Sequence, residues 1–131
     1  DLHSFPTRRS SDLEPEMLRA VRLVVDTGIH AKSWTREQAL AYMLGNTSMA
    51  PRDVEVEVDR YISVPGQACA YKIGELKLQE LRQRATRALG TKFDIRNFHE
   101  QVLDTGALPL EVLERKIDDW IAGVQMAAPS A

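Results

Sequence analysis

The chain has 131 residues, 44% hydrophobic and 27% charged, a composition that fits a folded globular domain and excludes a disordered segment. Its net charge of −2 gives no basic surface for nucleic acid, and no apolar run comes near the ~20 residues that cross a bilayer. Cys69 is the only cysteine, which excludes an internal disulfide and a cysteine-based zinc site.

The first thirteen residues, DLHSFPTRRSSDL, stand apart from the rest of the chain. A widely used sequencing-library adapter, read in frame, can encode them codon for codon, although an ordinary disordered leader has a similar composition. We expect residues 1–13 to be foreign and therefore leave them out of the reasoning about the fold. On this interpretation the natural sequence begins at Glu14 and continues upstream in the parent protein, so the chain is a C-terminal fragment.

The spacing of apolar residues predicts an all-α fold over residues 14–122. The first helix runs from Glu14 to about Ala31, with Pro15 in its first turn and Gly28 as a weak point. Thr35 and Gln38 form a capping box that opens a second helix, which ends at Gly45-Asn46. Its expected buried face consists of Ala39, Leu40, Tyr42, Met43 and Leu44.

A third helix is expected from Pro51. The segment 54–59 alternates as a strand would, but Val54, Val58 and Tyr61 continue a helical period, which favours a helix. Pro65 then breaks the chain. A long helix follows from about Gly66 to Leu89 with Gly90 as its C-terminal cap, and its expected packing residues are Ile73, Leu76, Leu78 and Leu81.

Two further helices complete the prediction. One spans Lys92 to Leu103, and the other runs from Pro109 to about Ile121 with an apolar face that includes Leu113 and Ile117. The segment 123–131 is expected to be a frayed tail.

Familiar catalytic motifs are missing from these helices. His99 and Glu100 begin a helical zinc-peptidase motif, but Leu103 stands where the second histidine is needed, so we predict no metal ligand here. Cys69 lies between alanines and is interpreted as a small buried apolar residue. The acidic residues of segment 55–59 are interpreted as a solvated helix face.

A first group of candidate binding residues lies on the first helix. Asp26 precedes His30 by four residues, so its carboxylate could accept from one ring nitrogen, fix the tautomer and leave the other nitrogen for a ligand. A histidine that caps or packs a helix end is the alternative. Arg22 precedes Asp26 by four residues and could form an ion pair with it.

A second group of candidates surrounds the Pro65–Gly66 step, where backbone N–H groups at a helix start are available to a ligand. Arginine can hold a carboxylate with two parallel hydrogen bonds, and tyrosine can donate to an oxyanion. Tyrosines that only pack helices, together with interhelical ion pairs, are the alternative. The candidates are Arg60, Tyr61, Gln67, Tyr71 and Lys72.

Several segments together resemble the C-terminal part of a bacterial family named domain of unknown function 885 (DUF885), and they cover residues 14–122. The quoted segments are MLRAVRLVVDTGIH (17–30), WTREQA (34–39), RY (60–61), PGQA (65–68), YKIG (71–74), LR (81–82), LG (89–90), FDIRNFH (93–99) and GALPL (106–110).

The resemblance implies a zinc-dependent, peptidase-like hydrolase whose metal is held by segments upstream of Glu14. This chain would then hold no cofactor itself and would be inactive alone, supplying a cleft wall to a peptide-like substrate and to the missing N-terminal half of its own parent. His30 and Tyr71 become the catalytic candidates, and Arg60, Tyr61 and Gln67 the residues that anchor the peptide. Arg22, Asp26 and Lys72 complete the expected substrate-binding set.

The alternative is a non-enzymatic helical module that binds a partner protein. Relatives often carry export signals, which favours the cell envelope as the location of the parent.

Overall fold

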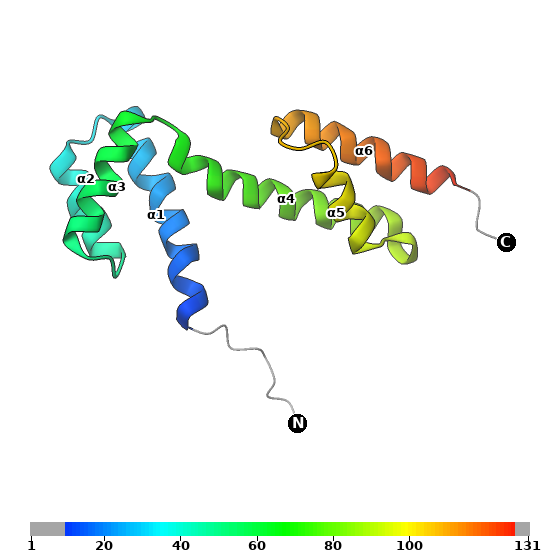
Figure 1. The fold of residues 1–131 in the computed structure, drawn as a ribbon, viewed down its shortest axis with the longest axis horizontal. Coiled ribbons are helices and arrows are strands. Elements are labelled where there is room, and N and C mark those ends of the chain that lie inside the picture. Colours follow the sequence, from blue (N-terminus) through cyan, green and yellow to red (C-terminus); the bar gives the residue numbers. More distant parts are fainter. Residues whose placement is uncertain (1–9, 128–131) are drawn as a thin grey trace, which may run out of the picture. The chain divides into compact units, whose positions relative to one another are not determined.

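The computed structural model describes residues 10–127, and within them the chain consists of helices and turns with no strand. This confirms the all-α prediction. The helices are α1 (Ser10–Lys32), α2 (Arg36–Asn46), α3 (Pro51–Ser63), α4 (Gln67–Leu89), α5 (Ile95–Leu103) and α6 (Leu110–Met126), with a short 3₁₀ helix, η1 (Gly90–Lys92), after α4 (Figure 1). No helix among the described residues is long and apolar enough to span a membrane.

The chain divides into two compact units, residues 1–73 and 74–131. The sequence predicted one domain over residues 14–122. The three-helix unit contains α1, α2, α3 and the first turns of α4. Its core forms where the apolar faces of these helices meet, and its buried residues are Val21, Val25, Ala39, Met43, Val54, Val58, Tyr61 and Ala68.

Local sequence explains the helix starts of this unit. The Thr35 hydroxyl accepts from the N–H of Gln38, and the Gln38 side chain accepts from the N–H of Thr35, so the predicted capping box is confirmed. Pro51 occupies the first turn of α3, where a missing N–H costs nothing. The helical interpretation of segment 54–59 is also confirmed, because Val54 and Val58 are fully buried while Val56 is exposed.

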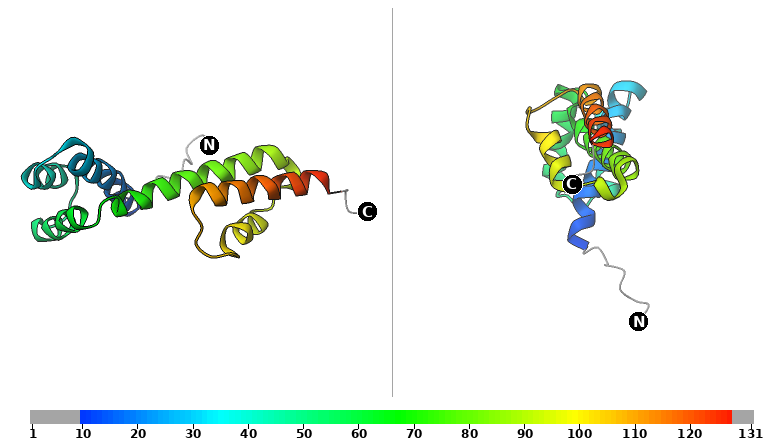
Figure 2. Two further views of the ribbon diagram at one scale, coloured as in Figure 1. Left: turned by 90° about the horizontal axis from the view of Figure 1, so that it is seen from above. Right: turned by 90° about the vertical axis from the view of Figure 1, so that its right-hand side faces the viewer.

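The second unit contains most of α4 together with η1, α5 and α6. Helices α4 and α6 lie side by side (Figure 2). The core consists of Leu81, Ala85, Leu89, Phe98, Leu113, Ile117 and Ile121.

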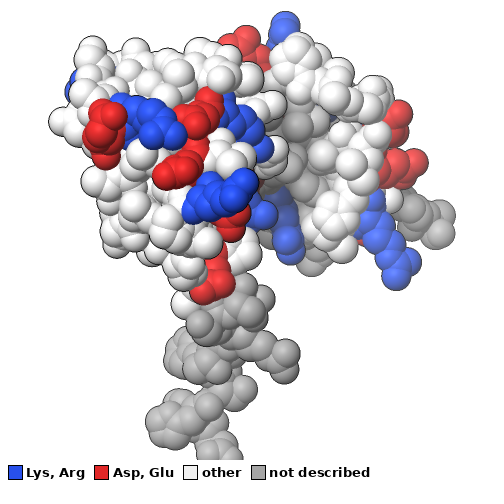
Figure 3. All heavy atoms as spheres, turned by 60° about the vertical axis from the view of Figure 1, so that its left-hand side comes forward, with Lys and Arg blue, Asp and Glu red and all other residues white. Residues whose placement is uncertain are grey.

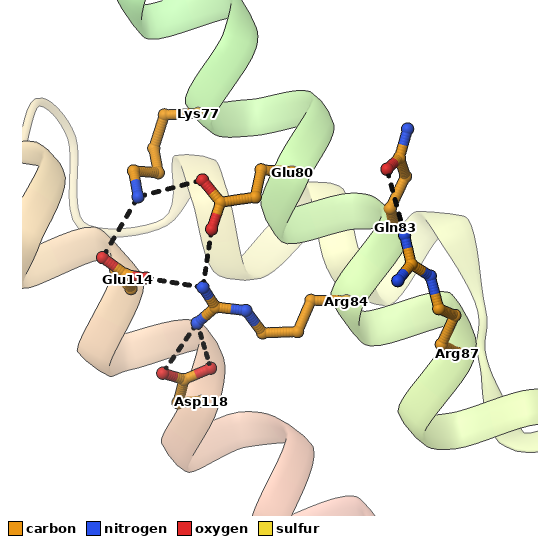
Figure 4. A network of polar contacts seen from close by, with 7 residues as sticks. All are labelled: Lys77, Glu80, Gln83, Arg84, Arg87, Glu114 and Asp118. Atoms are coloured by element: carbon orange, nitrogen blue, oxygen red, sulfur yellow. Dashed lines mark hydrogen bonds and ion pairs between the residues drawn. The ribbon is translucent and has the colours of Figure 1, made fainter.

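A surface network of ion pairs also joins α4 to α6. The Arg84 guanidinium donates to Asp118 at 2.9 and 3.0 Å and to Glu114 at 2.6 Å, and Lys77 pairs with Glu80 and Glu114 (Figure 4). Hydrogen bonds to Lys77 and Arg84 lower the pKa of Glu80, and bonds to the same two cations lower the pKa of Glu114. The pairs are exposed or only partly buried, so they fix the pairing of the helices more than they stabilise the fold.

Several predicted details of the second half are wrong. Helix α5 begins at Ile95, after an N-cap formed by Asp94, because η1 occupies the start of the predicted helix from Lys92. Helix α6 continues to Met126, past the predicted end near Ile121, and residues 128–131 of the predicted tail lie outside the described part.

The predicted packing face of α4 is also largely wrong, as is one residue of α2. Leu81 is buried, but Ile73, Leu76 and Leu78 are exposed, as is Leu44 on α2. Gly90 has a positive φ of 54° after α4, as a C-terminal cap requires. The foreign origin of residues 1–13 stays a prediction; α1 begins within this segment, at Ser10.

Candidate functional site

Two polar clusters of the three-helix unit contain most of the predicted site residues. The capping cluster consists of Asp26, His30, Gly66 and Cys69, with the backbone carbonyl of Tyr61. The guanidinium cluster consists of Arg22, Glu57, Arg60, Tyr61 and Tyr71. Both lie where α1 and α3 meet the turn that leads into α4. Figure 3 shows acidic and basic side chains next to one another on the face in view.

Asp26 is the buried polar residue of this core, with 2% of its surface exposed. Both carboxylate oxygens accept from the N–H of Gly66 at 3.1 Å, which satisfies a free donor just before α4. Gly66 has a φ of 80°, a conformation that glycine adopts without strain. The predicted ion pair between Arg22 and Asp26 is wrong, because Arg22 pairs with Glu57 instead.

The sequence predicted that Asp26 accepts a hydrogen bond from His30. In the structure a backbone carbonyl is the partner of His30 instead. Its Nε2 lies 2.8 Å from the carbonyl oxygen of Tyr61 and 3.8 Å from Asp26 Oδ1, which is too long for a hydrogen bond. A carbonyl can only accept, so Nε2 carries the proton and the neutral ring keeps Nδ1 as an acceptor. The side chain is 31% exposed, and Nδ1 has no hydrogen-bond partner among the described residues.

Cys69 lies in the first turn of α4 and is buried, as predicted. Burial raises the pKa of its thiol, and the charge of Asp26 together with a hydrogen bond to it raises the pKa further.

We therefore expect Cys69 to react slowly, because the thiolate is the reactive form. At pH 8, Ellman's reagent should label the native chain at least about tenfold more slowly than the urea-unfolded chain. Absorbance of the released thiolate measures both rates, and Cys69→Ser is the blank. Equal rates in the two states would contradict the buried, carboxylate-facing position.

Glu57 is the centre of the guanidinium cluster. Its Oε2 accepts from Tyr61 Oη at 2.7 Å, from Arg22 Nη2 at 3.2 Å and from Arg60 Nη2 at 3.2 Å. Arg22 Nε also donates to Tyr61 Oη at 3.1 Å. Only 18% of the Glu57 side chain and 15% of the Arg22 side chain are exposed, so the interpretation of Glu57 as part of a solvated face is wrong.

The two tyrosines of this cluster differ in their availability. Tyr61 is 1% exposed, and burial, followed by the hydrogen bond to Glu57, raises its pKa so that it stays neutral. Tyr71 is 50% exposed, and the Arg22 guanidinium lies 5.1 Å from the centroid of its ring. Tyr71 is therefore the tyrosine of this cluster whose side chain a ligand can reach.

Arg60 has an incomplete set of partners. Its guanidinium carbon lies 5.7 Å from the centroid of the Tyr61 ring, and Nη2 donates to Glu57. Its Nε is buried and has no hydrogen-bond partner among the described residues. A buried donor without a partner costs about 1–3 kcal/mol, so an acceptor from outside these residues would recover that energy.

Gln67 and Lys72 take no part in the contacts by which the two clusters are defined. Gln67 is exposed at the first residue of α4, and Lys72 is partly buried further along it. Their substrate-binding role stays a prediction.

Sequence reasoning missed Glu57, although it precedes Tyr61 by four residues and Arg60 by three, the spacing of neighbours on a helix. Among the described residues, no three His, Cys, Asp or Glu side chains lie together as a metal site would need. The resemblance places the zinc ligands upstream of Glu14, so the zinc of the parent stays a prediction.

This geometry defines the class of the protein: it is an all-α chain in which polar clusters join three helices. A family model described as "Bacterial protein of unknown function (DUF885)" matches residues 1–117, and the chain belongs to that family. The match includes residues 1–13. No curated protein matches the chain.

A solved structure adds to this comparison. It is described as "the putative lipoprotein from Colwellia psychrerythraea", and the chain is 51% identical to it with a TM-score of 0.82. The match covers 85% of this chain and 19% of the other, so this chain spans about a fifth of that protein's length.

Proposed function

We propose that this chain forms one wall of the substrate cleft of a larger peptidase-like hydrolase and is inactive by itself. The chain belongs to DUF885, and its resemblance to that family implies a peptidase-like hydrolase, which supports the proposal. The Colwellia protein shows that a related segment can be part of a much longer chain. That protein's description as a lipoprotein also supports a place at the cell envelope for the parent.

The position of His30 carries the proposal. The bond from Nε2–H to the Tyr61 carbonyl fixes one tautomer, and the partly exposed ring then presents Nδ1 as an acceptor. A ring oriented in this way can accept a hydrogen bond from a peptide N–H or hold another polar group of a peptide. The buried carboxylate of Asp26 lies beside the ring, with Oδ1 3.8 Å from Nε2.

Tyr71 supplies the second exposed group of the proposed wall. Its hydroxyl can donate to the oxyanion that develops on a carbonyl under attack, and the Arg22 guanidinium lies over its ring. The zinc expected in the intact parent would have to be bound by residues outside the described part, and no step proposed for these residues depends on it.

The test is Tyr71→Phe in the full-length parent, with peptide hydrolysis followed at several substrate concentrations. We expect kcat to fall about tenfold or more while KM changes less than about twofold, because the hydroxyl acts mainly in the transition state. Tyr42→Phe is the matched control, since Tyr42 packs against Trp34 and lies outside both clusters. An unchanged kcat in Tyr71→Phe would remove Tyr71 from the catalytic role.

A further inference from the structure

The guanidinium cluster has an excess of positive charge. Arg22 and Arg60 share the single carboxylate of Glu57, and Tyr61 stays neutral because its pKa is raised, so the formal charge of these four side chains is +1. A shared carboxylate satisfies each guanidinium only partly, because each one has five N–H donors. The cluster therefore has the charge and the donors to accept one further anion.

Arg60 is the residue of the cluster that can bind that anion. Arg22 uses both Nε and Nη2 inside the cluster, and only 15% of its side chain is exposed. Arg60 is 36% exposed and bonds Glu57 through Nη2 alone, while its Nε has no partner among the described residues.

The Tyr61 ring also restricts the orientation of the planar Arg60 guanidinium. The guanidinium carbon lies 5.7 Å from the centroid of the Tyr61 ring, which is fixed in the core and limits the directions in which the side chain can turn. A rotation about its terminal torsions can direct Nε–H and an Nη–H to one carboxylate. Glu57 then keeps its bonds to Arg22 and Tyr61.

We propose that Arg60 binds a carboxylate of the peptide substrate, so that the substrate class is anionic peptides. The inference rests on the proposed function, because it places this anion in the same cleft wall as His30 and Tyr71. The carboxylate is either the C-terminus of the peptide or an acidic side chain, and both offer two oxygens to the guanidinium fork.

The experiment measures equilibrium binding to the full-length parent by calorimetry with three probes. These are acetyl-trialanine, its C-terminal amide, and acetyl-Ala-Glu-Ala amide, in which only the side chain carries a carboxylate. We expect at least one anionic probe to bind about tenfold more tightly than the neutral amide. The probe that does so identifies the source of the carboxylate.

Variants then assign the preference to Arg60. Arg60→Gln should reduce it below about twofold, and Arg60→Lys, which keeps the charge but lacks the fork, should lose most of it. Arg36→Gln is the matched control, because Arg36 pairs with Asp59 on the exposed surface and should keep the full preference. Circular dichroism checks the folding of each variant. If Arg60→Gln does not fold, the result for Arg60→Lys is used in its place.

Equal binding of all three probes by the wild-type parent would overturn the inference, as would a preference that survives in folded Arg60→Gln. An Arg60 variant that is less stable but still prefers the anionic probes would show that the acceptor for Arg60 belongs to the parent chain itself. That result would also overturn the inference. Binding is measured without turnover, so a parent that binds anionic peptides through Arg60 but hydrolyses none contradicts the proposed hydrolase and not this site.

Discussion

Replacing Glu57 with glutamine lowers the free energy of unfolding of the three-helix unit by about 2–3 kcal/mol. The substitution keeps the size of the side chain but removes the charge that Arg22, Arg60 and the Tyr61 hydroxyl share. Two guanidiniums then face each other with no carboxylate between them, and only a neutral amide oxygen, a weaker acceptor, is left for them and for the buried Tyr61 hydroxyl. The partial exposure of the cluster keeps the loss below that of a fully buried ion pair.

Urea denaturation measures this loss, with Trp34 fluorescence as the probe. The chain has two tryptophans, one in each unit, so a Trp120→Phe background makes Trp34 the reporter of the three-helix unit. Glu55→Gln is the matched control, because Glu55 is exposed on the same helix, and it should change the unfolding free energy by less than about 0.5 kcal/mol. Equal effects of the two variants would show that Glu57 is not the centre of a stabilising cluster.

Gly28→Ala should destabilise the same unit by about 1–2 kcal/mol, although alanine favours a helix by about 1 kcal/mol over glycine. A Cβ at Gly28 would lie 2.5 Å from the Cδ2 and Cε3 atoms of Trp34, so the indole ring would have to move. That ring packs against Tyr42 with centroids 5.4 Å apart, and the backbone N–H of Trp34 donates to the carbonyl of Gly28. The steric cost therefore exceeds the gain in helix propensity.

Gly45→Ala is the control for this prediction, since a Cβ at Gly45 meets no atom within 4 Å. It should stabilise the unit by about 0.5–1 kcal/mol through helix propensity alone. The two variants should thus differ by about 1.5–3 kcal/mol in urea denaturation. If both stabilise the unit equally, the close contact between Gly28 and the Trp34 ring does not exist.

Local rules predicted much of the helical architecture from the sequence. The Thr35–Gln38 capping box, the proline in the first turn of α3 and the positive φ of Gly90 each depend on a few neighbouring residues, and all were confirmed. The passage of α1 through Gly28 was left open, because the reason for that glycine is the Trp34 ring, six residues away and outside the helix.

Prediction of the candidate site was less complete. Residue types and spacing selected His30, Tyr61 and Tyr71, but spacing also suggested an ion pair between Arg22 and Asp26 that the structure replaces. Arg22 bonds Glu57, which is 35 residues away in the chain, and Asp26 bonds Gly66, 40 residues away. A pair at helical spacing is only one of the partners available, and the packing of α1 against α3 decides which one is used.

The sequence by itself determined that this chain is helical, where most of its helices begin, and to which family it belongs, because these properties depend on local propensity and on residue patterns. Only the tertiary structure decided which polar groups are satisfied inside the three-helix unit, and it showed that Arg60 Nε has no partner among the residues that the structure describes. The physical reason is that burial removes water as a partner, so each polar group depends on whichever helix packs against it.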